Sequence, residues 1–189
     1  MMDKSKLSMT TVLIAVAVFA VFLFAGFSIG RDGSLLLVVL ALVSVGALIF
    51  FFLSGNKKEA ALSDAALADA RRMAAPSGAA RLYIVRHGFV GGQQGMNIAI
   101  DNSHRGQIKS GSALVADLAP GSHQLSVRMA RGGNKSEASL ALDLAADSVT
   151  VVKATSTMGT TTAAAHLVVM NDEAAARADL DKARFLAWQ

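Results

Sequence analysis

Two long apolar stretches fill most of the first third of the chain and predict membrane-spanning helices. Residues 9–29 and 34–53 contain no charged side chain, and each is close to the ~20 residues with which an α-helix crosses the hydrocarbon of a bilayer. Only residues 30–33 separate them. A helical hairpin with a tight polar turn satisfies every backbone amide within its own helix. The pattern therefore predicts an N-terminal tail at 1–8 and a transmembrane hairpin at 9–54.

Positive charges flank this hairpin at its two ends rather than at its turn. Lys4 and Lys6 precede it and Lys57 and Lys58 follow it, whereas the turn holds one arginine beside one aspartate. Because Lys and Arg in short flanks stay in the cytoplasm, we expect both ends and the following domain there, with the periplasm as the alternative. A cleaved signal peptide is disfavoured, since the first apolar run is too long and no small-x-small site precedes Gly30.

A polar segment at 55–78 follows the hairpin. Residues 57–74 are rich in Ala, Leu, Asp, Glu and Arg and contain neither Gly nor Pro, a composition that favours helix. We expect a juxtamembrane helix that continues the second span outward and ends at Pro76-Ser77-Gly78. Its basic residues either touch lipid phosphates or lie on a solvated linker helix; these interaction candidates are Lys57, Lys58, Arg71 and Arg72.

The hydrophobic period changes from helical to alternating after residue 79. Apolar and polar residues alternate in 96–100, 123–129 and 140–144, a pattern typical of half-buried strands. Turn-forming residues such as Pro120-Gly121 separate these runs. Regular short strands at this spacing predict a small antiparallel β-sandwich of about seven or eight strands at 79–170. The remaining strands are expected at 82–86, 107–109, 114–118, 149–154 and 164–170.

Residues 171–189 have charges that suit a C-terminal helix. Asn171 is a favourable N-cap, acidic residues follow it, and Lys182 and Arg184 lie near the end. The apolar residues of this segment either pack on the sandwich or meet a partner chain or the membrane interface. The interaction candidates among them are Phe185, Leu186 and Trp188.

The motif Arg86-His87-Gly88 ends the first expected strand and resembles the opening motif of the histidine phosphatases. In that family the Arg binds a phosphoryl group and the His attacks it, and a second His, here His166 as the candidate, completes the site. The family's motif continues with an acid or amide and then Thr, whereas Phe89-Val90 follows here. Phosphoryl transfer needs several groups that converge on the phosphate oxygens and the leaving group. We therefore keep phosphohydrolysis as an alternative only.

A second resemblance covers about 50 residues. The runs "ARLYIVRH", "NIAIDN" and "RGQIKSGSALVADLAPGSHQLSVR" resemble a bacterial family of β-sandwich domains of unknown function, which is common in small lipoproteins and similar in pattern to PEGA domains. The resemblance implies a β-sandwich and no reaction. This chain departs from the family pattern because a two-helix membrane anchor replaces the lipidated cysteine.

Composition narrows the function further. The chain has no cysteine, and its four histidines lack the short spacing of zinc ligands, so we expect no metal and no cofactor. A net charge of +4 is spread over the chain with one Trp and one Tyr, which disfavours nucleic acid as a partner. No small-molecule substrate suggests itself.

Together these features predict a non-enzymatic binding or scaffold protein in the bacterial inner membrane. We expect it to be an accessory subunit of a larger membrane complex, with membrane lipid and either another membrane protein or a second copy as partners. The alternatives are the phosphohydrolase above, with Arg86, His87 and His166, and a module that binds lipid or an envelope polymer.

Overall fold

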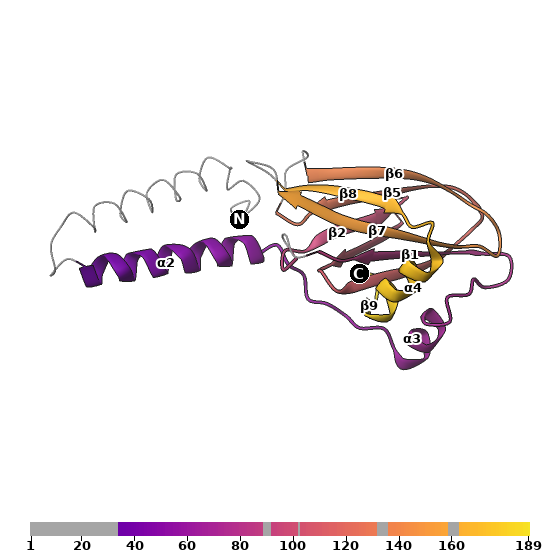
Figure 1. The fold of residues 1–189 in the computed structure, drawn as a ribbon, viewed down its shortest axis with the longest axis horizontal. Helices are drawn as coiled ribbons and strands as arrows, with labels where there is room; N and C mark the ends of the chain where they lie inside the picture. The colour runs from indigo at the N-terminus through magenta and orange to yellow at the C-terminus, as the bar shows by residue number, and fades with distance from the viewer. Residues whose placement is uncertain (1–33, 89–91, 102, 132–135, 159–162) are drawn as a thin grey trace. The chain divides into compact units, whose positions relative to one another are not determined.

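The computed structural model describes residues 34–88, 92–101, 103–131, 136–158 and 163–189 (Figure 1). The chain divides into two compact units, Met1–Ser54 and Gly55–Gln189. The first expected span, at 9–29, lies outside the described residues, as does the hairpin turn.

The first unit contains helix α2, Ser34–Leu53, which confirms a helix at the second apolar run. The helix closes with the amide of Ser54 donating to the carbonyl of Phe50 at 2.8 Å. Its side chains are described at residues 38–51 and 53. Among the described residues no helix meets both the length and the apolar character needed to cross a membrane. The two-span anchor therefore stays a prediction.

The prediction of a juxtamembrane helix at 57–74 is wrong for most of this segment. Residues 55–60 are not helical, Ala61 forms an isolated β-bridge, and the only helix in this segment is the short α3, Asp64–Ala70. Ser63 caps α3 by accepting a hydrogen bond from the amide of Ala66 at 3.4 Å. Helix propensity is a weak preference, and here hydrogen bonds to distant strands override it.

The second unit is mainly β, and its described residues form two sheets. Every strand expected from the alternation is present, although the strand expected at 107–109 lies at 104–108. Sheet A has the order β8 (Ala163–Val169), β7 (Val149–Met158), β1 (Ala80–Arg86), β4 (Ser112–Leu118) and β9 (Arg184–Leu186). Sheet B has the order β3 (His104–Ile108), β2 (Met96–Ile100), β5 (Gly121–Met129) and β6 (Glu137–Leu144).

The expectation of a purely antiparallel sandwich is wrong for sheet A, which is mixed. Strand β1 pairs antiparallel with β4 but parallel with β7, and β4 pairs parallel with β9. A period of two tells which face each residue takes, but it does not tell the direction of the neighbouring strand. Sheet B is antiparallel throughout.

The main hydrophobic core lies between the two sheets. Strand β1 supplies Leu82 and Ile84, and sheet B supplies its alternate buried residues, among them Ile98 and Val127. Because β1 lies in the middle of sheet A, all of its residues are buried, as its continuous apolar run indicates.

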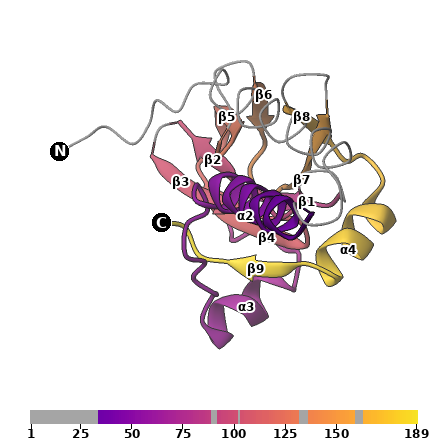
Figure 2. The same ribbon diagram turned by 90° about the vertical axis from the view of Figure 1, so that its left-hand side faces the viewer.

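A second, smaller core lies on the other face of sheet A. There α3 and α4 cover the sheet (Figure 2), and Tyr83 and Val85 of β1 pack against Ala70 of α3 and Leu180 of α4. The domain therefore has three layers, with helices on sheet A and sheet A on sheet B.

The C-terminal segment is not one helix. Helix α4 spans Glu173–Asp181, and its N-cap is Asp172 rather than Asn171. The chain then turns into β9. Phe185 of β9 packs into the smaller core and Leu186 into the main core. Successive residues of a strand point to opposite faces of the sheet, so Phe185 and Leu186 can fill two different cores. Residues on one face of a helix all point to the same side and could not do so.

Candidate functional site

Arg86 and His87 point to opposite faces of sheet A. Arg86 follows Ile84 on the face toward sheet B, where its guanidinium Nη1 donates to the carbonyl of Gln94 at 2.6 Å and to that of Ile108 at 3.1 Å. The side chain is only 2 % exposed, and burial lowers the pKa of the guanidinium to about 10. The arginine thus holds the end of β1 to sheet B.

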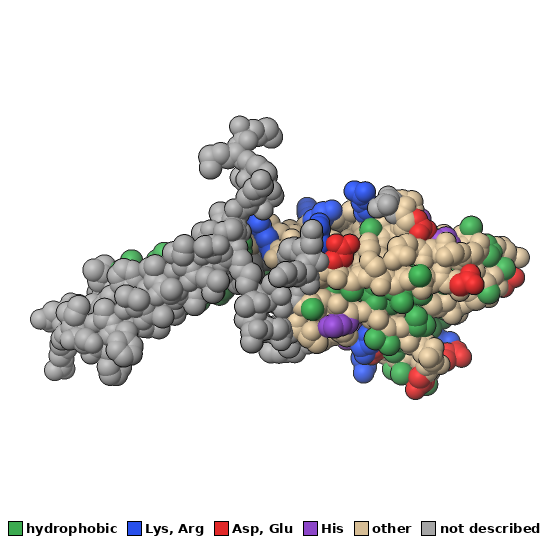
Figure 3. Space-filling view, turned by 90° about the horizontal axis from the view of Figure 1, so that it is seen from above, with side chains coloured by type: hydrophobic (Ala, Val, Ile, Leu, Met, Phe, Trp, Pro, Cys, Tyr) green, Lys and Arg blue, Asp and Glu red, His purple; other side chains and the backbone are tan. Residues whose placement is uncertain are grey.

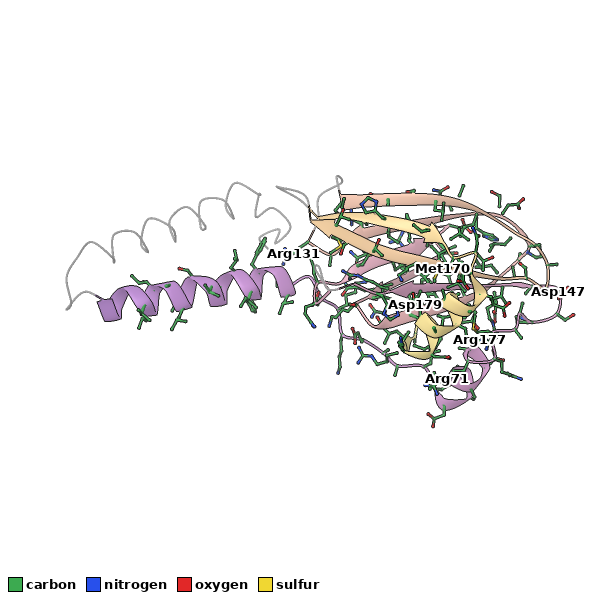
Figure 4. The ribbon with its side chains drawn as sticks, viewed as in Figure 1. Arg71, Arg131, Asp147, Met170, Arg177 and Asp179 are labelled. Atoms are coloured by element: carbon green, nitrogen blue, oxygen red, sulfur yellow. The ribbon has the colours of Figure 1, made fainter. Side chains whose placement is uncertain are left out.

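His87 lies on the outer face with Tyr83 and Val85. Its Nε2 is 2.9 Å from the carbonyl oxygen of Asp179 on α4, and since a carbonyl only accepts, Nε2 carries the proton. The carboxylate of Asp179 in turn binds the ammonium of Lys153 on β7 at 2.7 Å. Figure 4 shows Asp179 on α4 where the helix covers the sheet. These contacts fasten α4 to β1 and β7.

His166 shares the outer face of sheet A with His87. It lies on β8, is exposed, and is 2.9 Å from the hydroxyl of Thr157 on β7. The register pairs His166 with Thr155, and Ala154 with Arg86, so two strand spacings of about 5 Å each separate the two histidines. The structure brings both histidines to one face but turns Arg86, the expected phosphate ligand, away from them.

The apolar interaction candidates at the C-terminus lie against the sandwich. Phe185 and Leu186 are buried, and the ring of Phe185 meets Tyr83 edge-on with centroids 6.1 Å apart. The indole Nε1 of Trp188 donates to the carbonyl of Val115 at 2.6 Å, and its ring meets His104 edge-on at 5.3 Å. This placement matches packing on the sandwich, the first of the alternatives open to these residues.

The basic candidates are exposed but do not share one helix. Arg71 and Arg72 follow α3, and Arg72 pairs with Asp69 within that turn. Lys57 and Lys58 lie in the segment 55–61, which we call the strap because it is hydrogen-bonded along the edge of the sandwich. The expected basic helix face is therefore split into two separate pairs.

The first half of the strap is held by two amide side chains. Gln107, buried on β3, donates to the carbonyl of Gly55 at 3.1 Å and accepts the amide of Lys57 at 2.7 Å. Asn56 accepts the amide of Gly95 at 2.6 Å and donates to the carbonyl of Gln93 at 2.8 Å. A Cβ on Gly95 would lie 2.3 Å from Oε1 of Gln107, so any larger residue here would displace the Gln107 side chain from these hydrogen bonds.

The second half of the strap runs beside β9. The carboxylate of Glu59 pairs with Arg184 and lies 3.5 Å from the ammonium of Lys109. The amide of Ala187 donates to the carbonyl of Ala60 at 2.8 Å, and Ala61 forms an antiparallel bridge with Leu186. The strap therefore covers the β9 edge of sheet A.

Strand β8, the opposite edge of sheet A, has no hydrogen-bonded strand on its outer side among the described residues, although β6 of sheet B runs close to it. The amide of Met170 donates to the carbonyl of Val151 on β7. With the register, this bond shows which residues of β8 direct their peptide groups toward β7. In an antiparallel pair the peptide groups of alternate residues point outward, and here these belong to Ala165, Leu167 and Val169. The strand has no charged residue and no proline, the features that usually protect an edge.

Apolar side chains accompany this open edge. Val168 is 59 % exposed and Val169 36 % exposed, and Figure 3 shows apolar side chains in the open on one face of the domain. The edge strand of sheet B on the same side of the sandwich, β6, differs because it carries Glu137 and Asp143. The alternation of 164–170 predicts the strand, but nothing in the sequence says that it is an edge.

Among the described residues no three His, Asp or Glu side chains gather as they would around a metal ion. No protein-family model matches the chain, and no curated protein matches it either.

Proposed function

We propose that the protein is a non-enzymatic binding subunit of a larger inner-membrane complex, and that it holds an extended segment of another membrane protein along β8. The observation that carries the proposal is the open, uncharged β8 edge with its outward peptide groups at Ala165, Leu167 and Val169. An added strand satisfies these groups by backbone hydrogen bonds, and exposed side chains supply the specificity.

The contrast between the edges of the sandwich supports this assignment. The strap covers β9, the tail amide of Gln189 donates to the carbonyl of Arg105 on β3 at 2.9 Å, and β6 carries two acids. Soluble proteins protect exposed edges because unprotected ones pair with other chains. An edge left open beside three protected ones is suited to a partner strand.

Membrane anchoring by the hairpin at 9–54 remains part of the proposal. Helix α2 has no charge in its 20 residues, and its side chains include Leu42 and Phe50, which are 66 % and 74 % exposed. Apolar side chains exposed on all sides of a helix call for lipid or other membrane helices around them. The flanking Lys residues place the domain on the cytoplasmic side in this proposal.

The opposite orientation of Arg86 and His87 argues against the phosphohydrolase. A nucleophilic histidine needs a cation that reaches the same phosphoryl oxygens, whereas Arg86 donates to backbone carbonyls in the interior. We therefore propose no catalytic residue, and we interpret Arg86 and His87 as groups that tie β1 to sheet B and to α4.

A proline on the open edge tests the proposed function. In Val169→Pro the amide that faces the partner is lost, while the ladder to β7 keeps its hydrogen bonds. Val169→Thr is the matched control, because it keeps the amide and the branched shape. A photo-crosslinking residue at Val168 is introduced into the full chain in native membranes for all three backgrounds.

We expect one adduct with a specific membrane protein in the wild-type and Val169→Thr backgrounds, and its loss in Val169→Pro. Fluorescence of Trp188, the only tryptophan, confirms that each variant is folded. An adduct that survives Val169→Pro contradicts strand addition. An adduct of twice the chain's own mass replaces the accessory-subunit proposal with self-association.

A further inference from the structure

The outer face of sheet B carries a depression with a volume of about 350 Å³. It is separate from the β8 edge and from the histidines on sheet A. Asn97 and Ala99 of β2 and Ser126 of β5 lie at its floor. Their neighbours Ile98 and Val127 are buried in the main core, so these residues point outward by alternation. Helices α3 and α4 cover the other sheet, on its far face.

The strand register brings basic side chains around this floor. Ala99 pairs with Arg105 on one side and with Ser126 on the other, and Asn97 pairs with Arg128. The two arginines therefore come from β3 and β5, the two strands on either side of β2. Only the side chains of Asn97 and Ala99, on the outer face of β2, lie between them. An arginine side chain is long enough to span part of this width, so both guanidinium groups can converge on one ligand.

The strap supplies the third cation, Lys57. Its amide is fixed on Gln107, and Gln107 also donates to the side-chain oxygen of Asn97 at 2.8 Å. A buried amide side chain with all these partners holds the strap in one position relative to β2 and β3. Lys57 is therefore placed at the rim of the depression by the tertiary structure.

These three cations have no acid within ion-pair distance among the residues that the structure describes, whereas other cations of the domain, such as Arg81, Lys153 and Arg184, do. The one acid that lines the depression is Glu137. Glu137 lies opposite Arg128 in the register of β5 and β6, and the three cations outnumber this one acid. An excess of cations in a concavity raises the local concentration of anions.

We propose that this depression binds a phosphoryl oxyanion, held by Arg105, Arg128 and Lys57. Guanidinium groups match the oxygens of phosphate with paired hydrogen bonds, and the ammonium adds charge without a fixed direction. The same chemistry is presented by the headgroup of an anionic lipid and by a free phosphate. The lipid source rests on the membrane anchoring proposed above, since Lys57 lies four positions after Leu53 in the sequence; oxyanion binding itself does not.

The test uses the full chain in an uncharged detergent at constant ionic strength, with binding followed by calorimetry. One arm titrates inorganic phosphate, and the other titrates dihexanoyl-phosphatidylglycerol against its phosphatidylcholine analogue. We expect Arg105→Gln and Arg128→Gln each to weaken binding about tenfold, the size of one charge-assisted hydrogen bond. Glu137→Gln is expected to tighten binding, because it removes the one negative charge of the depression.

Arg177→Gln is the matched control, since this exposed arginine of α4 pairs with Glu173 away from sheet B; its affinity should equal that of the wild type. Saturable binding in either arm supports the site. Binding of phosphatidylglycerol identifies a lipid headgroup as a ligand, binding of inorganic phosphate identifies free phosphate, and binding in both arms identifies both. Absence of saturable binding in the wild type overturns the proposal, as does unchanged affinity in Arg105→Gln/Arg128→Gln. Crosslinking at Val168 tests the proposed β8 partner independently, so a failure of oxyanion binding can be told apart from a failure of strand addition.

Discussion

Replacing Arg81 by methionine should destabilise the sandwich strongly, although its partners are surface acids. The side chain of Arg81 is 3 % exposed, and its guanidinium binds both carboxylate oxygens of Asp117, at 2.6 and 2.9 Å. It also binds the carboxylate and the carbonyl of Asp69 on α3, at 2.6 and 3.2 Å. These contacts raise the pKa of Arg81 above its ordinary value, the bond to Asp117 first. Met keeps the apolar stem and removes all four bonds.

The expected size of the effect follows from the exposure of the partners. Both acids have side chains 42 % exposed, so water replaces the guanidinium and no buried charge is stranded. The loss in free energy of unfolding is therefore expected at the lower end of the ~3–5 kcal/mol that breaking a fully buried pair costs. With roughly 0.5–1.5 kcal/mol net for each of the lost bonds, we expect Arg81→Met to lower the free energy of unfolding by about 3 kcal/mol.

Arg72→Met is the matched control because Arg72 binds the same Asp69 from the surface, with a side chain 71 % exposed. We expect no measurable change there, as is usual for exposed ion pairs. Urea unfolding of the full chain in detergent, followed by the fluorescence of Trp188, measures both variants. A cost of less than about 1 kcal/mol for Arg81→Met, or equal effects of the two substitutions, would contradict this expectation.

Two further predictions concern a buried hydroxyl and a titrating pair. Tyr83→Phe removes the bond from the buried hydroxyl to the last carbonyl of α3, 2.6 Å long, and should cost about 1 kcal/mol in the same urea assay; no change would mean that water fills the gap. The bond to Asp101 and then the carbonyl of Ala119 raise the pKa of His123 above 6.5, so its stabilisation is complete below pH 6.5 and is lost as the pH rises through the raised value. Asp101→Asn should flatten this fall in a series of unfolding curves above pH 6.5, and an unaltered slope would assign the effect to another group.

Much of the fold follows from local pattern. The apolar run Leu82–Val85 predicts a central or covered strand, and β1 is buried on both faces. The alternation in 123–129 predicts which residues face the core, and Leu125, Val127 and Met129 are buried. The same rule places Arg86 and His87 on opposite faces, which the motif alone conceals. These features need only the two-residue period of a strand.

The C-terminal segment and the strap were harder to predict because their local signals favour helix. The helix does not continue past Asp181, and the chain forms β9 instead, because Phe185 and Leu186 fill two different cores. The strap is extended because Gln107, Arg184 and the backbone of residue 187 bind it. These partners lie about 50 to 130 positions away in the sequence, beyond any local propensity.

The faces of the strands at 80–169 and the apolar character of α2 are thus properties of neighbouring residues, and the chain encodes them directly. The parallel pairs of sheet A, the open β8 edge and the convergence of Lys57, Arg105 and Arg128 are not. They depend on which distant strands pair and in which direction, and a hydrophobic period is the same for either choice. The proposed partner surface and oxyanion site lie in this second group, because each is made by residues that only the pairing of the sheets brings together.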